Sequence, residues 1–419
     1  MGRSTATQAG VACRDSASLS RARRRRPPAS ISAADLIGTS RLILAGVNGM
    51  TDVVEGMHRN ISGLAPIVGP SRPGPTRGIT GLVYRNIRRV SALVGTSLEL
   101  SLTQLEPLLP ADGSSAGRDA ARSALNGVLG DYLATTDNPL AIPMQLTDGE
   151  TPLISGGAPL RAPVPEPSGR VLIMVHGLCM NDRQWCRNDH DHGRALAAEL
   201  GFTPLYLRYN SGRPVADNGQ DFADLLEQLV HQWPVAVTEL VILGHSMGGL
   251  VSRSALRSGR LAGHRWPEFL SKMVFLGTPH LGASLERWGT GLDTLLGISP
   301  YSAPIGHIGK VRSAGIRDLG EGNIGGGKES SAGEHLGKAV RYFAVAATIR
   351  PAHREGLASG FGDGLVSLRS ALGKHRHRDR SLAIPAAHQA IIDQTNHFDL
   401  LASKRVYQCL AHWLGQGNP

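Results

Sequence analysis

A serine between two glycines gives this chain its clearest chemical signature. Ser246 lies at the centre of Gly244-His245-Ser246-Met247-Gly248, between a short apolar run at 238–243 and a segment of helical character at 249–256. A strand, a G-x-S-x-G turn and a helix make a nucleophile elbow, in which small residues let the chain turn sharply and present the serine hydroxyl. Although 52 glycines make the bare pattern common by chance, the flanking strand and helix make it specific. We therefore predict that Ser246 is a nucleophile.

Asp363 and His397 are the predicted partners of this serine. A serine hydroxyl reacts readily only when a base takes its proton and a third group orients that base. In a sheet with such an elbow, the acid and then the histidine follow the serine along the chain. Asp363 lies between two glycines in a turn after the predicted strand at 340–347. His397 follows the predicted last strand at 389–392 and is predicted to begin the terminal helix.

Other acids and histidines in the second half of the chain compete for these two roles. They are Asp318, Asp379, Asp393, His388 and His412. Asp318 precedes the predicted strand at 340–347, Asp379 lies in a basic run, and Asp393 stands too close to His397 for a separate loop to present it. His388 precedes the predicted last strand, and His412 lies well inside the final helix. Position therefore favours Asp363 as the acid and His397 as the base.

A segment upstream of the serine predicts an oxyanion hole. The apolar strand at 170–175 ends in His-Gly, and the loop after an early strand of this kind supplies one backbone N–H to the oxyanion. The residue after the nucleophile supplies the other. We therefore predict that the main-chain amides of Leu178 and Met247 bind the oxyanion. Five further residues are predicted to shape the elbow and this loop: His176, Gly177, Gly244, His245 and Gly248.

Five segments in this order carry a family resemblance. They are 175–178, 244–249, 276–282, 362–366 and 396–401. Together they resemble the α/β-hydrolase lipases and esterases, in the branch of the bacterial lipases and PGAP1-like hydrolases. The resemblance implies a mostly parallel, doubly wound α/β sheet and hydrolysis of acyl-containing carboxylic esters through an acyl-serine intermediate, with no cofactor and no metal. Acyl transfer, thioester hydrolysis and lipid hydrolysis at a membrane surface remain alternatives with the same triad.

The sequence divides into a tail, a helical region and a catalytic domain. Residues 1–30 hold seven arginines and one aspartate, which is most of the net charge of +10, and predict a disordered tail rather than a nucleic-acid site. Residues 31–135 contain three helical patterns, the third from about 116 to 133, and predict an N-terminal helical extension. Residues 140–417 form the predicted α/β-hydrolase domain, in which 284–338 is a lid or cap insertion.

Composition also bears on partners and compartment. No stretch is long and apolar enough for a transmembrane helix, and the first 30 residues lack the apolar region of a signal peptide. A cytoplasmic location is therefore expected, with export as the alternative. We expect the N-terminal helices to pack as a cap on the core, with peripheral membrane contact as their alternative use.

The cysteines and one polar segment are assigned no chemistry. Four cysteines in a chain this long do not make a disulfide framework, although a bridge between Cys179 and Cys186 stays open. The polar segment at 188–193 resembles a metal site only in composition. It is instead predicted to cap a helix at 194–200, which Gly201 ends.

Overall fold

The computed structural model describes most of the chain from residue 116 onward and parts of the segment before it. The described residues are 34–46, 48, 88, 89, 92, 116–160, 164, 166–283, 313–325, 340–351, 362–376 and 381–416. The described residues belong to two compact units: one holds those at 116–134 and from 142 onward, and the other holds those before 116 and at 135–141. The predicted arginine-rich tail, most of the first two helical patterns and most of the lid insertion lie outside the described residues.

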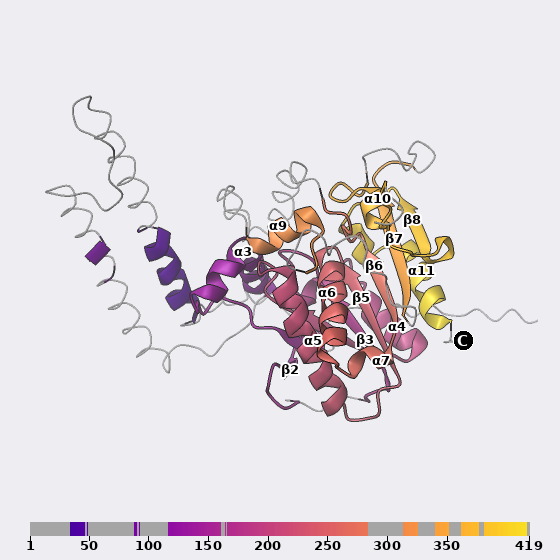
Figure 1. Cartoon of the computed structure of the whole chain (residues 1–419), viewed down its shortest axis with the longest axis horizontal. Helices are drawn as coiled ribbons and strands as arrows, with labels where there is room; N and C mark the ends of the chain where they lie inside the picture. Colours follow the sequence, from indigo (N-terminus) through magenta and orange to yellow (C-terminus); the bar gives the residue numbers. More distant parts are fainter. Residues whose placement is uncertain are drawn as a thin grey trace, which may run out of the picture. The chain divides into compact units, whose positions relative to one another are not determined.

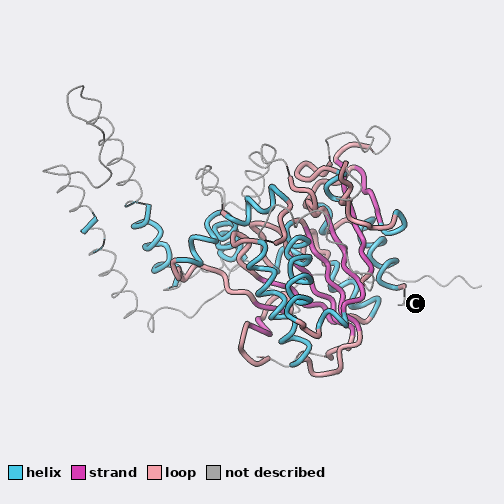
Figure 2. Tube along the Cα trace, viewed as in Figure 1, coloured by secondary structure: helices cyan, strands magenta, loops and turns pink. Residues whose placement is uncertain are grey.

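Within the described residues, eight strands form one sheet in the order β2-β1-β4-β3-β5-β6-β7-β8 (Figures 1 and 2). The strands are β1 Gln145–Thr147, β2 Pro152–Ser155, β3 Arg170–Val175, β4 Thr203–Arg208, β5 Glu239–His245, β6 Leu270–Leu276, β7 Arg341–Thr348 and β8 Gln389–Asp393. Strands β3 to β8 pair in parallel, whereas β1 is antiparallel to both β2 and β4. The sheet is therefore mostly parallel, with one antiparallel hairpin at its edge.

The central strands are apolar because helices cover both faces of the sheet. Residues 171–175 of β3 and 240–243 of β5 are completely buried, which explains their near-continuous apolar sequence. The register pairs Val175 with Gly244 and His245 with Leu276. The carboxyl ends of β3, β5 and β6 are therefore level, so the loops that follow them leave from the same edge of the sheet.

The helices form a layer on each face of the sheet. They are α3 Ala116–Thr135, α4 His192–Leu200, α5 Val215–Gln232, α6 Met247–Ala262, α7 Trp266–Phe269, α9 Ala314–Glu321, α10 Leu368–Ala371 and α11 Lys404–Gly415. The described residues also form three short 3-10 helices, η2 Asp182–Trp185, η6 Ala386–His388 and η7 Asp399–Leu401. Helices α5 and α6 pack together on the face toward the viewer in Figure 1, and α4 packs with α11 on the other face.

Helix α3 forms where the third helical pattern predicts one, but it packs in the same compact unit as the sheet. Asn210 Nδ2 donates to the carbonyl of Gly130 at 2.8 Å. Ser313 Oγ donates to the carbonyl of Gly127 at 2.7 Å, and the Ala314 amide donates to Asp131 Oδ2 at 2.8 Å. Helix α3 therefore belongs to the compact unit that contains the sheet.

The second compact unit is described mainly by a helix over residues 34–46. Leu36 and Ile43, one heptad apart, are exposed on it. Asn138 Nδ2 donates to the carbonyl of Gly38 at 3.1 Å and joins the helix to the segment at 135–141. Of the helices that the structure describes, none is long and apolar enough to cross a membrane.

Candidate active site

Ser246 lies at a sharp turn between β5 and α6. Its backbone has φ 53° and ψ −125°, a conformation that residues with a side chain adopt rarely and that is concentrated at functional sites. The Ser246 amide donates to the carbonyl of Leu276 at 2.8 Å, so the neighbouring strand fixes the turn. The strand, turn and helix that the sequence predicted around this serine are present.

The two glycines of the turn are required by close backbone approach. A Cβ on Gly248 would lie 2.3 Å from the carbonyl oxygen of Val175 and 2.6 Å from that of His176. A Cβ on Gly244 would lie 2.7 Å from the Gly249 amide nitrogen. Any side chain at either position would separate α6 from the end of β3 or from the turn itself.

Asp363 and His397 are joined by a short hydrogen bond. His397 Nδ1–H donates to Asp363 Oδ2 at 2.6 Å, and both side chains are buried. The His397 amide also donates to the carbonyl of Asp363 at 3.0 Å. With Nδ1 as the donor, a neutral ring keeps its basic lone pair on Nε2, which is the tautomer that a general base needs.

Asp363 is held rigidly by the turn in which it lies. Its Oδ1 accepts from the amides of Leu365 at 3.0 Å and Val366 at 2.8 Å, which leaves Oδ2 for the histidine. The glycine-flanked turn that the sequence predicted thus orients the carboxylate with main-chain donors.

The competing acids and histidines have other partners in the structure. Asp318 Oδ2 accepts from the Val215 amide at the start of α5, and Asp393 pairs with Arg405 at 2.5 Å. His388 Nδ1 donates to the carbonyl of Tyr342, and His412 lies within α11. Asp379 lies outside the described residues.

One local expectation about His397 was wrong. The residue does not begin the terminal helix: it lies in a turn before η7, and α11 begins only at Lys404. The physical reason is that Asn396 Oδ1 accepts from the amides of Phe398 and Asp399, which makes a separate turn here. His245 supports this turn, because its Nε2–H donates to the carbonyl of His397 at 3.1 Å. Burial first, then the nearby His397, hold the pKa of His245 well below its usual value, so this ring is neutral.

The amides of Leu178 and Met247 are both available to donate to an oxyanion. Met247 is the first residue of α6, where an amide has no partner within the helix. The neighbours of Leu178 are engaged, since Cys179 N donates to Ser211 Oγ at 3.0 Å and Met180 N to the carbonyl of Gly177 at 3.3 Å. Among the hydrogen bonds of the described residues, none uses the amide of Leu178 or Met247.

The serine and the histidine are not joined by a hydrogen bond in the described part of the chain. A Cβ on Gly177 would lie 3.1 Å from Ser246 Cβ and 3.2 Å from His245 Nδ1, so the loop after β3 lies against the elbow. The His245 ring lies 4.7 Å from the His397 ring, centroid to centroid. In structures without substrate a serine–histidine hydrogen bond is often long or poorly aligned and tightens only on binding.

His176 is a buried structural histidine. Its Nδ1–H donates to the carbonyl of Gly177 at 2.8 Å, and its ring stacks on Tyr209 at 4.4 Å. Burial lowers the pKa of His176 to about 4. Tyr209 donates its hydroxyl to the carbonyl of His176 at 2.9 Å, so both residues fix the end of β3.

The remaining candidates supply no further chemistry. Cys179 and Cys186 are free thiols, and burial raises the pKa of Cys179 to about 12. Asp191 caps α4 by accepting from the Arg194 amide, and Gly201 ends that helix, as the sequence predicted. Over the described ranges no group of three metal-ligating side chains occurs. A cavity of about 270 Å³ is lined by none of the three predicted triad residues but by Gly149, Glu150, Asp182, Arg183, Cys186, Asp191 and Arg194.

Sequence reasoning missed the residues that support the loop after β3. Ser211 and Tyr209 follow β4, and α3 contacts the loop from a distant part of the chain. A polar Asn-Ser-Gly-Arg run at the end of a predicted strand was the available signal at 210–213, whereas nothing in α3 pointed to this role.

Comparisons with known proteins give a family match for part of the chain. Residues 166–294 match the family described as the PGAP1-like alpha/beta domain. A comparison with curated proteins finds no match. Among solved structures, a mature Bacillus licheniformis lipase is 20% identical, with 60% of this chain and 96% of that chain covered and a TM-score of 0.41. An esterase of Pyrobaculum calidifontis is 12% identical, with 75% and 96% covered and a TM-score of 0.39.

The fold class follows from the topology and the family match. The strand order, the elbow between β5 and α6, and the PGAP1-like match identify the α/β-hydrolase fold that the sequence motifs predicted. The predicted lid insertion and the first part of the N-terminal extension fall largely on residues that the structure does not describe.

Proposed function

We propose that this protein is a serine hydrolase that cleaves carboxylic esters, with Ser246 as nucleophile, His397 as base and Asp363 as the acid that orients it. The observation that carries the proposal is the 2.6 Å hydrogen bond between His397 Nδ1 and Asp363 Oδ2. It leaves Nε2 as the proton acceptor, and it lies in a fold whose elbow presents a serine in a rare backbone conformation.

The proposed reaction proceeds through an acyl-serine. Ser246 Oγ attacks the carbonyl carbon while His397 Nε2 takes the hydroxyl proton, and Asp363 stabilises the resulting imidazolium. The carbonyl oxygen becomes an oxyanion and accepts from the amides of Leu178 and Met247. His397 then returns the proton to the leaving alcohol. Water, deprotonated by the same imidazole, attacks the acyl-serine and releases the carboxylic acid.

The acyl acceptor and the bond cleaved define the rival functions. An acyltransferase would use an alcohol in place of water, and a thioesterase would release a thiol. The same triad serves all three, so the nature of the substrate decides among them. The predicted contact with a membrane surface through the N-terminal helices concerns residues that lie largely outside the described part of the chain.

The proposal is tested with a panel of p-nitrophenyl esters of increasing chain length, a phospholipid and a triacylglycerol emulsion. A fluorophosphonate probe should label the wild-type protein, and Ser246→Ala should abolish both labelling and hydrolysis with nearly unchanged thermal unfolding. Ser403→Ala is the matched control, because the Ser403 side chain makes no capping hydrogen bond at the start of α11. Labelling of Ser246→Ala, or hydrolysis retained by it, would contradict the assignment.

A further inference from the structure

We propose that helix α3 positions the oxyanion loop, defined here as residues 177–182, and that it acts through Gly127. The inference rests on the proposed function, because the Leu178 amide in this loop is a proposed donor to the oxyanion. Helix α3 precedes the whole sheet in the chain and contributes no side chain to the proposed triad. Gly127 is accordingly a positioning residue.

The oxyanion loop needs support from outside itself. Cys179, directly after Leu178, has φ 60°, a backbone conformation that is disfavoured for a residue with a side chain. The Cys179 amide points away from the loop and donates to the buried hydroxyl of Ser211 at 3.0 Å. Since consecutive residues share a rigid peptide plane, a shift of Cys179 also moves the donor residue before it.

Helix α3 lies against Cys179 so closely that only glycine fits. A Cβ at position 127 would lie 2.2 Å from Cys179 Sγ and 3.0 Å from both its Cα and its amide nitrogen. The Cys179 thiol also donates to the carbonyl of Ala124 at 3.8 Å, which is a weak sulfur hydrogen bond. The thiol is thus enclosed by the helix, and the backbone of residue 179 has no room to move toward it.

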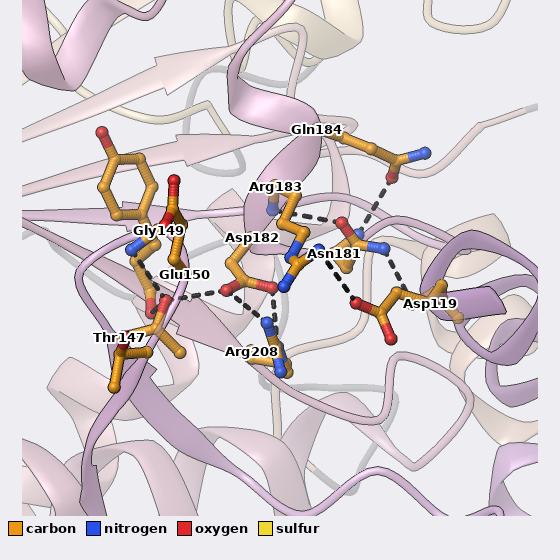
Figure 3. Close-up of polar contacts among 12 residues, drawn as sticks. Asp119, Thr147, Gly149, Glu150, Asn181, Asp182, Arg183, Gln184 and Arg208 are labelled. Atoms are coloured by element: carbon orange, nitrogen blue, oxygen red, sulfur yellow. Dashed lines mark hydrogen bonds and ion pairs between the residues drawn. The ribbon is translucent and has the colours of Figure 1, made fainter. Parts of the chain in front are cut away.

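Further contacts follow the same face of α3. Ser123 accepts from Asn181 Nδ2 at 3.2 Å, and Asp119 pairs with Arg183 at 3.5 Å. Asp119, Ser123 and Gly127 follow one another at steps of four, so they share one side of the helix. Figure 3 shows Asp119 facing the loop beside Asn181 and Arg183.

The far end of the loop is fixed to the sheet by a buried carboxylate. Asp182 accepts from Arg208 Nε at 2.7 Å and from Arg208 Nη2 at 2.8 Å, and Thr147 Oγ1 donates to it at 2.7 Å (Figure 3). Asn181 caps η2, with its own amide donating to Gln184 Oε1 at 3.0 Å. The loop is therefore anchored to β1 and β4 at its far end, and α3 limits the movement of residues 178–180.

The Gly127→Ala substitution separates positioning from general stability. Alanine has a higher helix propensity than glycine, but its methyl group would press on Cys179, so a purely structural role of α3 predicts a change in stability with unchanged turnover. Positioning predicts in addition that kcat for the best p-nitrophenyl ester falls about 10- to 100-fold, with KM little changed, because the donor is displaced rather than removed. Hydrogen exchange of residues 177–181 should become faster.

A second variant tests the hydrogen bond that holds Cys179 on the side away from α3. Ser211→Ala removes the acceptor of the Cys179 amide and should also lower kcat and accelerate exchange at 177–181. Ala121→Gly is the matched control, since it loosens α3 by lowering its helix propensity at a position off the face that carries Asp119, Ser123 and Gly127. It should lower the melting temperature and leave kcat unchanged.

The outcomes distinguish this inference from the proposed function. Unchanged kcat and unchanged exchange in both Gly127→Ala and Ser211→Ala would overturn the inference while ester hydrolysis stands, and so would an equal loss of kcat in Ala121→Gly. If the wild-type protein neither hydrolyses esters nor reacts with the fluorophosphonate, the proposed function fails. Exchange at 177–181 then still decides whether α3 holds the loop.

Discussion

The elbow and the oxyanion loop lie against each other, yet they are built differently. The elbow is made by contiguous residues, and its geometry is fixed by main-chain approaches such as that of Gly248 to the carbonyl of Val175. The oxyanion loop takes its shape from side chains and helix surfaces far away in the sequence, namely Ser211, Arg208 and α3. One half of the proposed site is thus formed by contiguous residues that pack on neighbouring strands, and the other half takes its shape from side chains and a helix in distant parts of the chain.

This difference has a consequence for substitutions. A change in the elbow disturbs the packing of α6 on the sheet, so stability and turnover should fall together. A change around the oxyanion loop displaces one amide while the sheet stays intact, so turnover should fall more than stability does. The three predictions below test this division, beginning with the largest effect.

Loss of the acid should have the largest effect. Asp363→Asn keeps the shape of the side chain but removes the charge that holds the His397 tautomer, and the analogous change in a serine protease triad lowers kcat by about 10⁴. We expect a similar loss in ester hydrolysis with near wild-type secondary structure, measured by steady-state kinetics and circular dichroism. Asp393→Asn, which removes a surface ion pair with Arg405, is the control. A greater loss in the control, or in Asp318→Asn, would show that the acid lies elsewhere.

Acid destabilisation should be the next largest effect. Burial lowers the pKa of His176 to about 4, and it also lowers the pKa of His245. The unfolded chain takes up a proton near the usual histidine pKa of about 6.5 and the folded chain does not, so stability is complete above that pH and falls as the pH drops toward 4. His176 alone should contribute a loss of about 3 kcal/mol.

Urea unfolding at about pH 7 and about pH 4.5 measures this loss, within the range where histidine sites titrate. His176→Asn can keep the donor to the carbonyl of Gly177 while it removes the titrating ring, so its stability should depend less on pH. The same pH slope in wild type and variant would show that His176 does not carry the effect.

Substitution of an elbow glycine should have the smallest effect on free energy, but it compares the two regions most directly. Gly248→Ala brings a methyl group against two main-chain carbonyls of residues 175 and 176, and overpacking of this kind costs about 1–3 kcal/mol. The melting temperature and kcat should decline together, whereas in Gly127→Ala kcat should decline more than the melting temperature. A Gly248→Ala variant with normal stability and lower kcat would remove the distinction between the two regions.

The same division explains what the sequence predicted. Ser246, Asp363 and His397 were identified because each follows a predicted strand of a parallel sheet, where the carboxyl ends of strands meet. Their roles remain proposals, but the hydrogen bond between Asp363 and His397 joins residues 34 apart, as their placement required. The start of α11 was predicted too early, since the turn made by Asn396 interrupts the pattern of the last helix.

The support of the oxyanion loop could not be predicted in this way. Gly127 in a helical pattern reads as a weak helix former, and only the approach of Cys179 explains why no larger residue stands there. Asn181 and Ser123 are 58 residues apart, and no periodicity links positions that meet only after the sheet has formed. Charge gave no clue either, because the pair of the buried Asp182 with the partly buried Arg208 cannot be told from a surface ion pair in the sequence.

Helix α3 also constrains the order in which the molecule is completed. It leaves the ribosome before any strand of the sheet, yet Gly127 and Asp131 find their partners 186 and 183 residues later, at Ser313 and Ala314. Contacts of such long range form slowly, because most of the chain must be ordered before they can close. A nascent chain that already contains the elbow at residue 246 therefore still lacks the contacts of α3 with residues 313 and 314.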